Sequence, residues 1–333
     1  MANITVLGCG FGTALAVMLN SYGHRVTAWS KYQSEIDTIL KDREQKKLLP
    51  GVKIPESIRF TADPACVKGA DIIIAAIPSA FLRDGISRVK DYVSPESVIL
   101  NVGKGFEENT FNRLSQVISD EIPENPVVVM AGPCHAEEVG RGVPTSVVVA
   151  SGCPDKAEYI QETLMNPNFR IYVNEDVIGC EAAPALKNPV ALCCGIVEGM
   201  GLGDNTLAAL MTRGLTEITR LGVALGARWE TFTGLAGVGD LVVTCTSVHS
   251  RNHRAGILIG KGVPVEEAIR QVGTVEGYNC CKIVHHLAKA KGVPMPITDK
   301  LYGVCFNGEN PEESVKSLMN RPGKNERERF WNN

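Results

Sequence analysis

Residues 4–16 read ITVLGCGFGTALA and decide the fold. An apolar strand leads into three glycines, and the small residues of a helix N-terminus follow at once. Such a unit turns bare backbone N–H groups toward the pyrophosphate of a dinucleotide. The usual spacing is G-x-G-x-x-G, whereas Gly8, Gly10 and Gly12 place the last glycine one residue early. We therefore predict a dinucleotide-binding turn that is one residue short, with Phe11 before the last glycine and one N–H fewer for the pyrophosphate; a tight turn without a ligand is the alternative.

Seven short apolar runs in the first half of the chain predict strands, with helical stretches between them. Several of the runs are continuous and β-branched, which is typical of strands buried on both faces of a parallel sheet. We therefore predict a doubly wound, Rossmann-like α/β domain over residues 1–180. The predicted strands are Ile4–Leu7, Arg25–Trp29, Asp71–Ile77, Ser97–Val102, Pro126–Met130, Thr145–Ala150 and Arg170–Val173, and the predicted helices are Thr13–Tyr22 and Thr110–Glu121.

Strand signals largely stop after about residue 179, and long helical patterns follow. The chain has 333 residues, more than one hydrophobic core usually serves, so we predict a second, all-helical domain over residues 181–333. Its helices are expected at Leu186–Met200, Thr206–Leu225, Pro264–Val272 and Cys281–Lys291. Pro184, just before the first of these helices, is tolerable if it lies at the first helical position.

Composition excludes several classes of function. A net charge of −3 gives no reason to expect nucleic acid or an anionic membrane as partner. The eleven scattered cysteines lack the spacing of a zinc site, so we expect no metal and reduced thiols in a reducing compartment. There is no signal-peptide pattern and no apolar run near the roughly 20 residues of a membrane-spanning helix. We therefore expect a cytoplasmic protein.

Two lysines follow predicted strands of the α/β domain. The second strand ends in Trp29-Ser30-Lys31, where a fold that prefers NAD often carries an acid. Lys31 offers a cation to a 2′-phosphate instead, which favours NADP weakly; a solvated surface lysine is the alternative. Lys104 stands between two glycines after a buried strand, at the sheet edge where ligands bind in open α/β folds. An exposed loop lysine is the alternative there too.

The helical half carries the other charged candidates. Lys187 is expected near the start of an apolar helix at the joint between the domains, where a desolvated lysine is suited to general acid/base work. Asp240 follows a glycine pair, and residues 250–252 read Ser-Arg-Asn. A hydroxyl, a planar cation and an amide together are the groups that hold a phosphate and its neighbouring hydroxyls. A surface lysine and a capped loop are the alternatives.

These motifs coincide in one family. Over about residues 3–325 the chain resembles the bacterial-type NAD(P)-dependent glycerol-3-phosphate dehydrogenases. The resemblance is carried by GTALA at 12–16, KGFE at 104–107, GPCHAEEV at 132–139, ALKN at 185–188, GLGDNT at 201–206, TRGL at 212–215, the segment 234–252, EG at 276–277 and MPIT at 295–298.

The resemblance implies reversible hydride transfer between NAD or NADP and sn-glycerol 3-phosphate, with dihydroxyacetone phosphate as the ketone. It also implies a homodimer that supplies glycerol 3-phosphate for glycerophospholipid synthesis. By the same similarity Lys187 is the general acid/base, Lys104 stabilises the substrate oxygen, and Asp240 orients Lys187 and binds substrate hydroxyls. The implied substrate-binding residues are Lys104, Gly132, Cys134, Lys187, Asp240, Ser250, Arg251 and Asn252. The implied cofactor-binding residues are Gly8, Gly10, Phe11, Gly12, Lys31, Lys104, Ala136, Arg251 and Glu276.

The chain departs from the family pattern at four places. A serine is missing from the glycine turn, Gly103 replaces Ser or Thr, Cys134 replaces Ser, and residues 182–184 replace a glycine-rich segment. Every charged residue of the implied site remains, which favours an active enzyme. Two other hypotheses stay open: a related β-hydroxyacid dehydrogenase with a carboxylate-binding pocket, and a catalytically silent protein that binds nicotinamide or glycerol phosphate.

Overall fold

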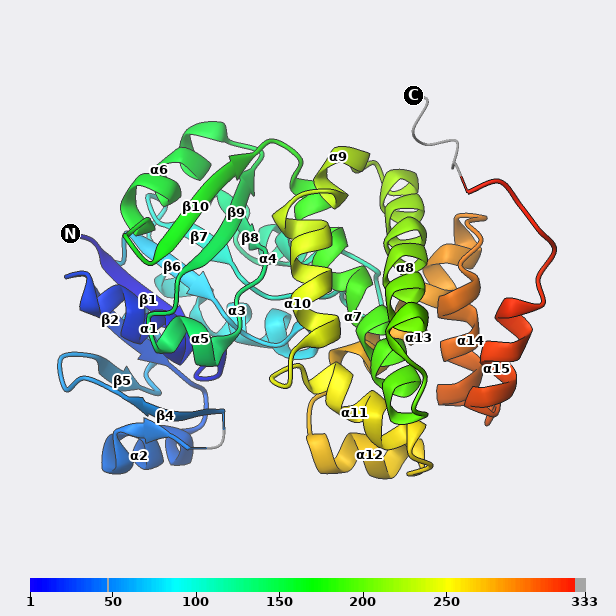
Figure 1. Ribbon diagram of the computed structural model, residues 1–333. Helices are drawn as coiled ribbons and strands as arrows, with labels where there is room; N and C mark the ends of the chain where they lie inside the picture. Colours follow the sequence, from blue (N-terminus) through cyan, green and yellow to red (C-terminus); the bar gives the residue numbers. More distant parts are fainter. Residues whose placement is uncertain (47, 327–333) are drawn as a thin grey trace. The chain divides into compact units, whose positions relative to one another are not determined.

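The computed structural model describes residues 1–46 and 48–326. The chain divides into two compact units, Met1–Cys180 and Glu181–Asn333. Figure 1 labels the helices and strands along the chain. Residues 327–333, at the end of the predicted helical domain, lie outside the described part.

The first unit is built on an eight-stranded sheet in the order β10-β9-β8-β7-β6-β1-β2-β5. All neighbouring strands are parallel except β9, which runs antiparallel to β8. The strands are β1 (Asn3–Leu7), β2 (Arg25–Trp29), β5 (Arg59–Thr61), β6 (Ile72–Ala75), β7 (Val98–Asn101), β8 (Val127–Ala131), β9 (Thr145–Ser151) and β10 (Phe169–Asn174). The seven predicted runs form seven of them. The short β5 and the hairpin of β3 (Glu44–Gln45) with β4 (Leu49–Lys53) were missed, because these segments are brief and lack an apolar pattern.

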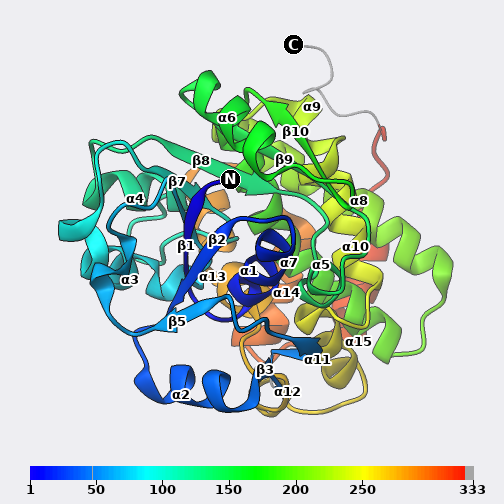
Figure 2. The same ribbon diagram turned by 90° about the vertical axis from the view of Figure 1, so that its left-hand side faces the viewer.

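Alternate residues of the central strands face two separate cores. On β6, Ile72 and Ile74 belong to one core, while Ile73 and Ala75 belong to the other. The period of two along a strand produces this division. The first core includes residues of α1 (Phe11–Ser21), α2 (Gln33–Asp42), α5 (Ala136–Gly140) and α6 (Pro154–Leu164), and the second those of α3 (Leu82–Val89) and α4 (Leu114–Glu121) (Figure 2). Helices thus cover both faces, which confirms the doubly wound fold.

The loops after β1, β2, β6, β7 and β8 leave the same edge of the sheet, because these strands are parallel. The loop after β6 contains the short 3₁₀ helix η2 (Ser79–Phe81). Two other 3₁₀ helices lie elsewhere: η1 (Pro64–Val67) follows β5, and η3 (Lys90–Tyr92) follows α3. The helix predicted from Thr110 begins only at Leu114. The side chain of Gln116 accepts a hydrogen bond from the Arg113 backbone N–H at 3.0 Å and so caps the helix there.

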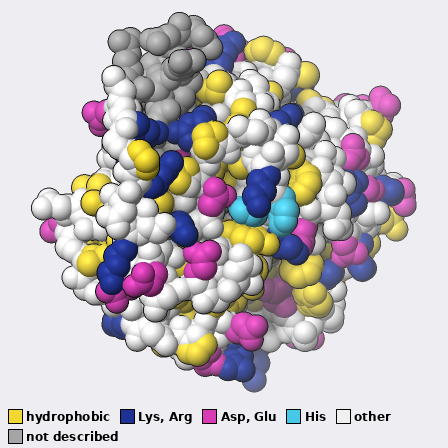
Figure 3. Space-filling model, turned by 90° about the vertical axis from the view of Figure 1, so that its right-hand side faces the viewer, with side chains coloured by type: hydrophobic (Ala, Val, Ile, Leu, Met, Phe, Trp, Pro, Cys, Tyr) yellow, Lys and Arg dark blue, Asp and Glu magenta, His cyan; other side chains and the backbone are white. Residues whose placement is uncertain are grey.

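The second unit is helical, as predicted. Its first helix, α7 (Val177–Gly199), begins within the last residues of the first unit. The elements that follow are α8 (Asp204–Ala224), α9 (Trp229–Phe232), a π-helical turn (Leu235–Gly239), α10 (Asp240–Thr246), α11 (Arg251–Gly260), α12 (Val265–Val272), α13 (Glu276–Ala290), α14 (Pro296–Phe306) and α15 (Pro311–Met319). The face in Figure 3 carries acidic and basic side chains interspersed rather than one large basic patch. Across residues 1–46 and 48–326 no single helix is long and apolar enough to cross a membrane, although the bent pair Trp229–Thr246 and Arg251–Gly260 meets the length and composition limits when taken together.

Helix α7 corrects two expectations. It begins at Val177, so Pro184 lies inside the helix rather than at its first position, and Lys187 lies in its middle rather than near its start. Proline removes one backbone hydrogen bond and tends to bend a helix, yet both Pro184 and Pro189 are accommodated. The predicted helix began at Leu186, so the turns from Val177 to Ala185 were missed.

Helices α7 and α11 pack backbone against backbone. A Cβ atom on Gly195 would stand 2.1 Å from the His253 carbonyl oxygen, and one on Gly256 would stand 2.2 Å from the Leu192 carbonyl oxygen. Only glycine permits this approach. The contact fixes the register of α11 against α7, the two helices that carry Asn252 and Lys187.

Candidate functional site

The glycine turn joins β1 to α1 at the ligand-binding edge of the first unit. Gly8 has a φ of +106°, and a Cβ there would stand 2.5 Å from the Ala76 carbonyl oxygen. At Gly10 a Cβ would meet only the Leu48 side chain, at 3.7 Å, so the backbone is open to a ligand. At Gly12 a Cβ would stand 2.7 Å from Val6, which shows how closely α1 packs on β1. The geometry at the three glycines fits what a dinucleotide-binding turn requires: a tight turn, an open approach for a ligand and close packing of helix on strand.

No side chain caps the start of α1, whose N-cap residue is Gly10. The first N–H groups of a helix lack partners within the helix and attract an anion. Phe11, the first residue of α1, is half-buried against the first core. The turn therefore fits the pyrophosphate of a dinucleotide in spite of its short spacing.

A side-chain network holds the turn from outside. Gln45 donates a hydrogen bond to the Cys9 carbonyl oxygen at 3.2 Å and another to Glu35 at 3.3 Å. Glu35 in turn accepts one from the Ser30 hydroxyl at 2.5 Å. The end of β1 and the end of β2 are thereby linked through α2 and β3, a link that motif spacing gave no means to predict.

Lys31 is paired with an acid that the sequence did not single out. Its Nζ lies 3.0 Å from Asp84 Oδ2 in the first turn of α3. The same ammonium group lies 5.1 Å from the Tyr32 ring centroid and 5.5 Å from that of Phe81. Asp84 also accepts a hydrogen bond from Arg88. Lys31 is therefore the cation at the end of β2, as predicted from its position, and it already has an anionic partner.

Lys104, Gly132 and Cys134 are brought together after two neighbouring strands. Lys104 Nζ donates to the Gly132 carbonyl oxygen at 3.2 Å, and Cys134 Sγ lies 3.2 Å from the same oxygen. Ala136, two residues further on, is the first residue of α5. Gly103 has a local reason to lack a side chain: a Cβ there would stand 2.9 Å from Leu114 and 3.3 Å from the Ile77 carbonyl oxygen.

An ion-pair network holds the segment that carries Lys104. Arg83 on α3 makes a bidentate pair with Glu107, with distances of 2.7 Å from Nε and 2.9 Å from Nη2. Arg83 also contacts Asp120 at 3.0 Å and Glu121 at 3.1 Å on α4. Hydrogen bonds from Arg83 lower the pKa of Glu107. Planar bidentate pairing fixes direction as well as distance, so Glu107 anchors the chain three residues after Lys104.

The second unit contains a buried lysine–aspartate pair. Lys187 Nζ on α7 lies 2.7 Å from Asp240 Oδ1, and the two side chains are only 3% and 1% exposed. Nζ also donates to the Asp240 carbonyl oxygen at 3.2 Å and to the Thr244 hydroxyl. Thr244, one turn after Asp240 on α10, donates to that same carbonyl at 2.7 Å. Sequence reasoning missed Thr244; its spacing of four from Asp240 on a helix is the signal that points to it.

Asn252 belongs to the same group of helices. Its Nδ2 donates to Asn188 Oδ1 at 3.1 Å, and its Oδ1 accepts from the Gly277 N–H at 2.8 Å. Asn188 is the neighbour of Lys187 on α7, while Gly277 lies in the first turn of α13. The amide therefore links α7, α11 and α13 beside the Lys187–Asp240 pair.

Ser250, Arg251 and Glu276 stand where α11 and α13 begin. The buried Ser250 hydroxyl caps α11 by accepting from the His253 N–H at 3.2 Å. Arg251 is the exposed first residue of α11, and Glu276 is the half-buried first residue of α13. The structure thus pairs Lys187 with Asp240 directly and joins Asn252 to Asn188, the chain neighbour of Lys187, while Ser250 and Arg251 precede Asn252 in the chain.

Two other kinds of site find no support in the described residues. No group of three or more His, Cys, Asp or Glu side chains there is arranged to hold a metal ion. Burial raises the pKa of the Cys9, Cys193 and Cys281 thiols, which makes these three poor nucleophiles.

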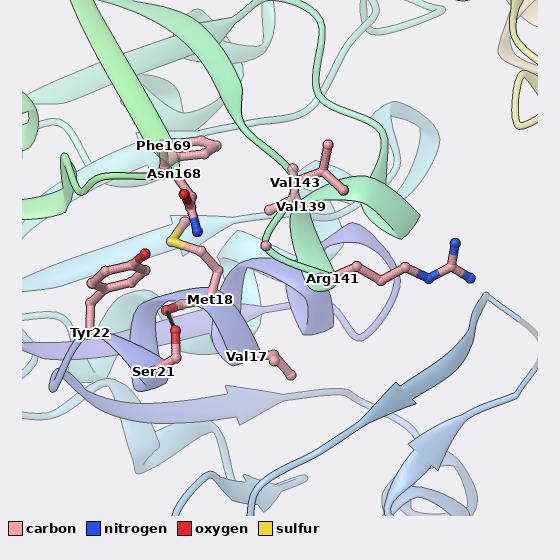
Figure 4. A pocket seen from close by; sticks show the side chains of 11 residues that line it. Val17, Met18, Ser21, Tyr22, Val139, Arg141, Val143, Asn168 and Phe169 are labelled. Atoms are coloured by element: carbon pink, nitrogen blue, oxygen red, sulfur yellow. Dashed lines mark hydrogen bonds between the residues drawn. The ribbon is translucent and has the colours of Figure 1, made fainter.

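A cavity of about 240 Å³ lies in the first unit, at the C-terminal end of α1. Met18, Tyr22, Val139 and Phe169 line it (Figure 4). The Arg141 side chain points away from it and donates a hydrogen bond to the Pro50 carbonyl oxygen at 3.2 Å. The cavity therefore offers a phosphate no charged partner and lies at the opposite end of α1 from the glycine turn.

Comparisons with known proteins agree along the whole chain. Residues 3–157 match the model of the NAD-dependent glycerol-3-phosphate dehydrogenase N-terminus, and residues 176–316 match that of its C-terminus. A glycerol-3-phosphate dehydrogenase (NAD(P)+) of Desulfitobacterium hafniense is 47% identical over 98% of this chain and 93% of its own length. One of Moorella thermoacetica is 49% identical over 97% of each. The crystal structure of glycerol-3-phosphate dehydrogenase from Coxiella burnetii superposes with a TM-score of 0.92 at 35% identity, over 96% of this chain and 99% of that one.

Proposed function

Since this chain belongs to the family of NAD-dependent glycerol-3-phosphate dehydrogenases, it is an NAD(P)-dependent oxidoreductase, and we propose that it interconverts sn-glycerol 3-phosphate and dihydroxyacetone phosphate. The observation that carries the proposal is the buried pair of Lys187 and Asp240, 2.7 Å apart. A lysine is rarely this buried unless it is paired. An ammonium group held away from water beside a carboxylate is suited to deliver and recover one proton at a fixed point.

Lys187 acts as the general acid/base. During reduction its ammonium group gives a proton to the ketone oxygen while hydride adds to the C2 carbon. During oxidation its neutral amine takes the hydroxyl proton back. Asp240 and the Thr244 hydroxyl hold Nζ by direct contacts, and so fix the direction of proton transfer.

Lys104 stabilises the same substrate oxygen as it gains charge. A preorganised cation costs no reorganisation at the moment of reaction and is worth most where water is excluded. The contact of Lys104 with the Gly132 carbonyl keeps Nζ over the ends of β7 and β8. The remaining substrate contacts come from Gly132, Cys134, Asp240, Ser250, Arg251 and Asn252.

NAD(H) or NADP(H), when bound, accepts or supplies the hydride. The open backbone at Gly10 and the uncapped start of α1 would hold its pyrophosphate, with Gly8, Phe11 and Gly12 shaping the turn. The other residues assigned to the cofactor are Lys31, Lys104, Ala136, Arg251 and Glu276.

The cellular setting is part of the proposal. Eleven free cysteines suit a reducing compartment, and we place the enzyme in the cytoplasm on that ground. We further propose a homodimer that supplies glycerol 3-phosphate for glycerophospholipid synthesis, as the resemblance to the family implies.

The test follows nicotinamide absorbance with each cofactor. We expect NADH or NADPH to be consumed only after dihydroxyacetone phosphate is added. Lys187→Ala should lower kcat by about 10³-fold while circular dichroism shows the fold retained, and Lys316→Ala, which removes an exposed lysine of α15, should leave kcat unchanged. Turnover of Lys187→Ala within a few-fold of wild type would remove Lys187 from the mechanism.

The same assay separates the two other hypotheses. A related β-hydroxyacid dehydrogenase would turn over a β-hydroxy acid and resist competition by glycerol phosphate. A silent binding protein would bind the cofactor or glycerol phosphate tightly and show no turnover with either cofactor.

A further inference from the structure

The pair of Lys31 and Asp84 lies where the first unit presents the end of β2. Lys31 follows Trp29, the last residue of β2, by two positions, and Asp84 lies in the first turn of α3. Their charged atoms are 3.0 Å apart, and the side chains remain 25% and 45% exposed. A ligand arriving from solvent can therefore reach both groups.

The end of the second strand is where a dinucleotide fold meets the adenosine ribose. NADP differs from NAD there by one phosphate on the 2′-oxygen. Tyr32 and Phe81, whose rings flank the Lys31 ammonium, are 56% and 54% exposed and offer flat surfaces beside it. Of the residues at this point of the chain, Lys31 attracts a 2′-phosphate and Asp84 repels one.

Asp84 is a permanent anion at this place. Hydrogen bonds from Arg88 and Lys31 lower the pKa of its carboxyl to about 2. At neutral pH it is fully ionised, so a 2′-phosphate must compete with it for the Lys31 ammonium. NADH does not compete with Asp84 for Lys31 in this way, because its 2′-hydroxyl is neutral.

We propose that Asp84 sets the ratio of NADPH to NADH affinity by occupying Lys31, which makes it a specificity-determining residue. The inference rests on the proposed binding of the dinucleotide at the glycine turn, and it is independent of the catalytic roles given to Lys104 and Lys187. Lys31 attracts the 2′-phosphate of NADPH, and Asp84 opposes its binding. Specificity between two ligands commonly needs an attractive and a repulsive group.

The test measures binding, not turnover. The dissociation constants of NADH and NADPH are obtained for the full-length protein by nicotinamide fluorescence titration without substrate. Asp84→Asn should lower the Kd of NADPH relative to that of NADH by about fivefold, the scale of an exposed ion pair. Lys31→Gln should raise the same ratio, and in the Lys31→Gln background Asp84→Asn should have a smaller effect, because Arg88 is then the one remaining cation of the two that pair with Asp84.

Asp155→Asn is the matched control. Asp155 is also an acid in the first turn of a helix and lies 3.2 Å from a lysine, Lys156. It follows β9, which is antiparallel to β8, so it stands at the opposite edge of the sheet. The charge change is identical, and the affinity ratio should stay at the wild-type value.

Two results would overturn the proposal. One is an equal change of both affinities in Asp84→Asn; the other is a ratio shift of the same size in Asp155→Asn, which would mean that net charge alone acts. Loss of both affinities in Gly10→Val, but not in Asp84→Asn, would support the location of the cofactor. Retention of both in Gly10→Val would instead contradict the proposed cofactor site, so the two failures are distinguishable.

Discussion

Two of the lysine–aspartate pairs have nearly equal geometry and very different surroundings. Lys187 and Asp240 lie 2.7 Å apart with 3% and 1% of their side chains exposed, while Lys31 and Asp84 lie 3.0 Å apart with 25% and 45% exposed. Judged by distance alone, the two ion pairs would be expected to contribute equally to stability. Burial separates them: water screens the exposed pair, whereas each buried charge depends on the other for solvation it has lost.

The first prediction compares two variants, each of which lacks the aspartate of one pair. Asp240→Ala leaves the Lys187 charge buried without its carboxylate and should lower the free energy of unfolding by about 3–5 kcal/mol. Asp84→Ala leaves Lys31 in contact with solvent, so the free energy of unfolding should stay close to the wild-type value. Urea denaturation followed by circular dichroism compares the two variants directly.

The double variant Lys187→Met/Asp240→Leu is the control for that prediction. Replacing both charges by apolar groups removes the unsolvated ion, so much of the stability lost in Asp240→Ala should return although turnover does not. If Asp240→Ala unfolds at the same urea concentration as Asp84→Ala, the contrast drawn from burial is wrong.

Glu217 extends the comparison of buried and exposed charges, because this buried acid accepts its hydrogen bonds from backbone N–H groups rather than from a lysine. On α8, it accepts hydrogen bonds from the N–H groups of Ile297 at 2.8 Å and Thr298 at 3.3 Å, at the start of α14. Burial outweighs these bonds and raises its pKa to about 7 from an ordinary value of 4.5, with Arg220 opposing and Asp299 reinforcing the shift.

The second prediction follows from that raised pKa. Between pH 4.5 and 7 the folded protein binds the proton that the unfolded chain releases, so this contribution to stability is complete below 4.5 and is lost as pH rises through 7. The free energy of unfolding should fall by roughly 3 kcal/mol across this window, when other groups are subtracted by comparison with Glu217→Gln. Urea unfolding at pH 5, 6, 7 and 8 measures the difference. A difference between the two proteins that does not change with pH would contradict it.

The third prediction concerns a pair of intermediate exposure, Arg83 with Glu107. Glu107→Gln weakens the bidentate anchor near Lys104, and we expect kcat to fall by about tenfold with a smaller change in KM, because orientation rather than binding is lost. Asp120→Asn removes a different partner of Arg83, on α4, and serves as the control with unchanged kcat. Equal effects of the two substitutions on kcat would show that Arg83 acts only through general stability.

The sequence predicted most of the sheet and few of the contacts that this comparison uses. Continuous β-branched runs such as 71–77 identify buried strands, because the strands of a parallel sheet are covered on both faces and carry apolar residues at successive positions. Lys31 and Lys187 were predicted from their positions after a strand and in an apolar helix. Of their two aspartate partners, only Asp240 was predicted. Each lysine is separated from its aspartate by 53 residues, and the family resemblance linked Asp240 to Lys187, whereas nothing in the sequence linked Asp84 to Lys31.

Helix α7 shows the limit of local rules for the elements themselves. The apolar pattern predicted a helix from Leu186, with Pro184 tolerated at the first position, yet α7 runs without a break from Val177 through both prolines. Tertiary context can outweigh local propensity in this way. The position of Lys187 in mid-helix, with its surroundings, therefore became visible only in the folded chain.

The last and smallest effect is that of salt. Raising the ionic strength from about 0.1 M to 1 M shortens the Debye length from about 10 Å to about 3 Å, which weakens an exposed pair and leaves a buried one almost untouched. The small effect of Asp84→Ala on the urea midpoint should therefore disappear in 1 M NaCl, while that of Asp240→Ala should persist. The preference for NADPH gained in Asp84→Asn should weaken in the same salt, because the 2′-phosphate meets Lys31 at the surface. If both pairs respond equally to salt, water reaches Lys187 as freely as it reaches Lys31. Proton transfer from a Lys187 ammonium group shielded from solvent would then lose its support.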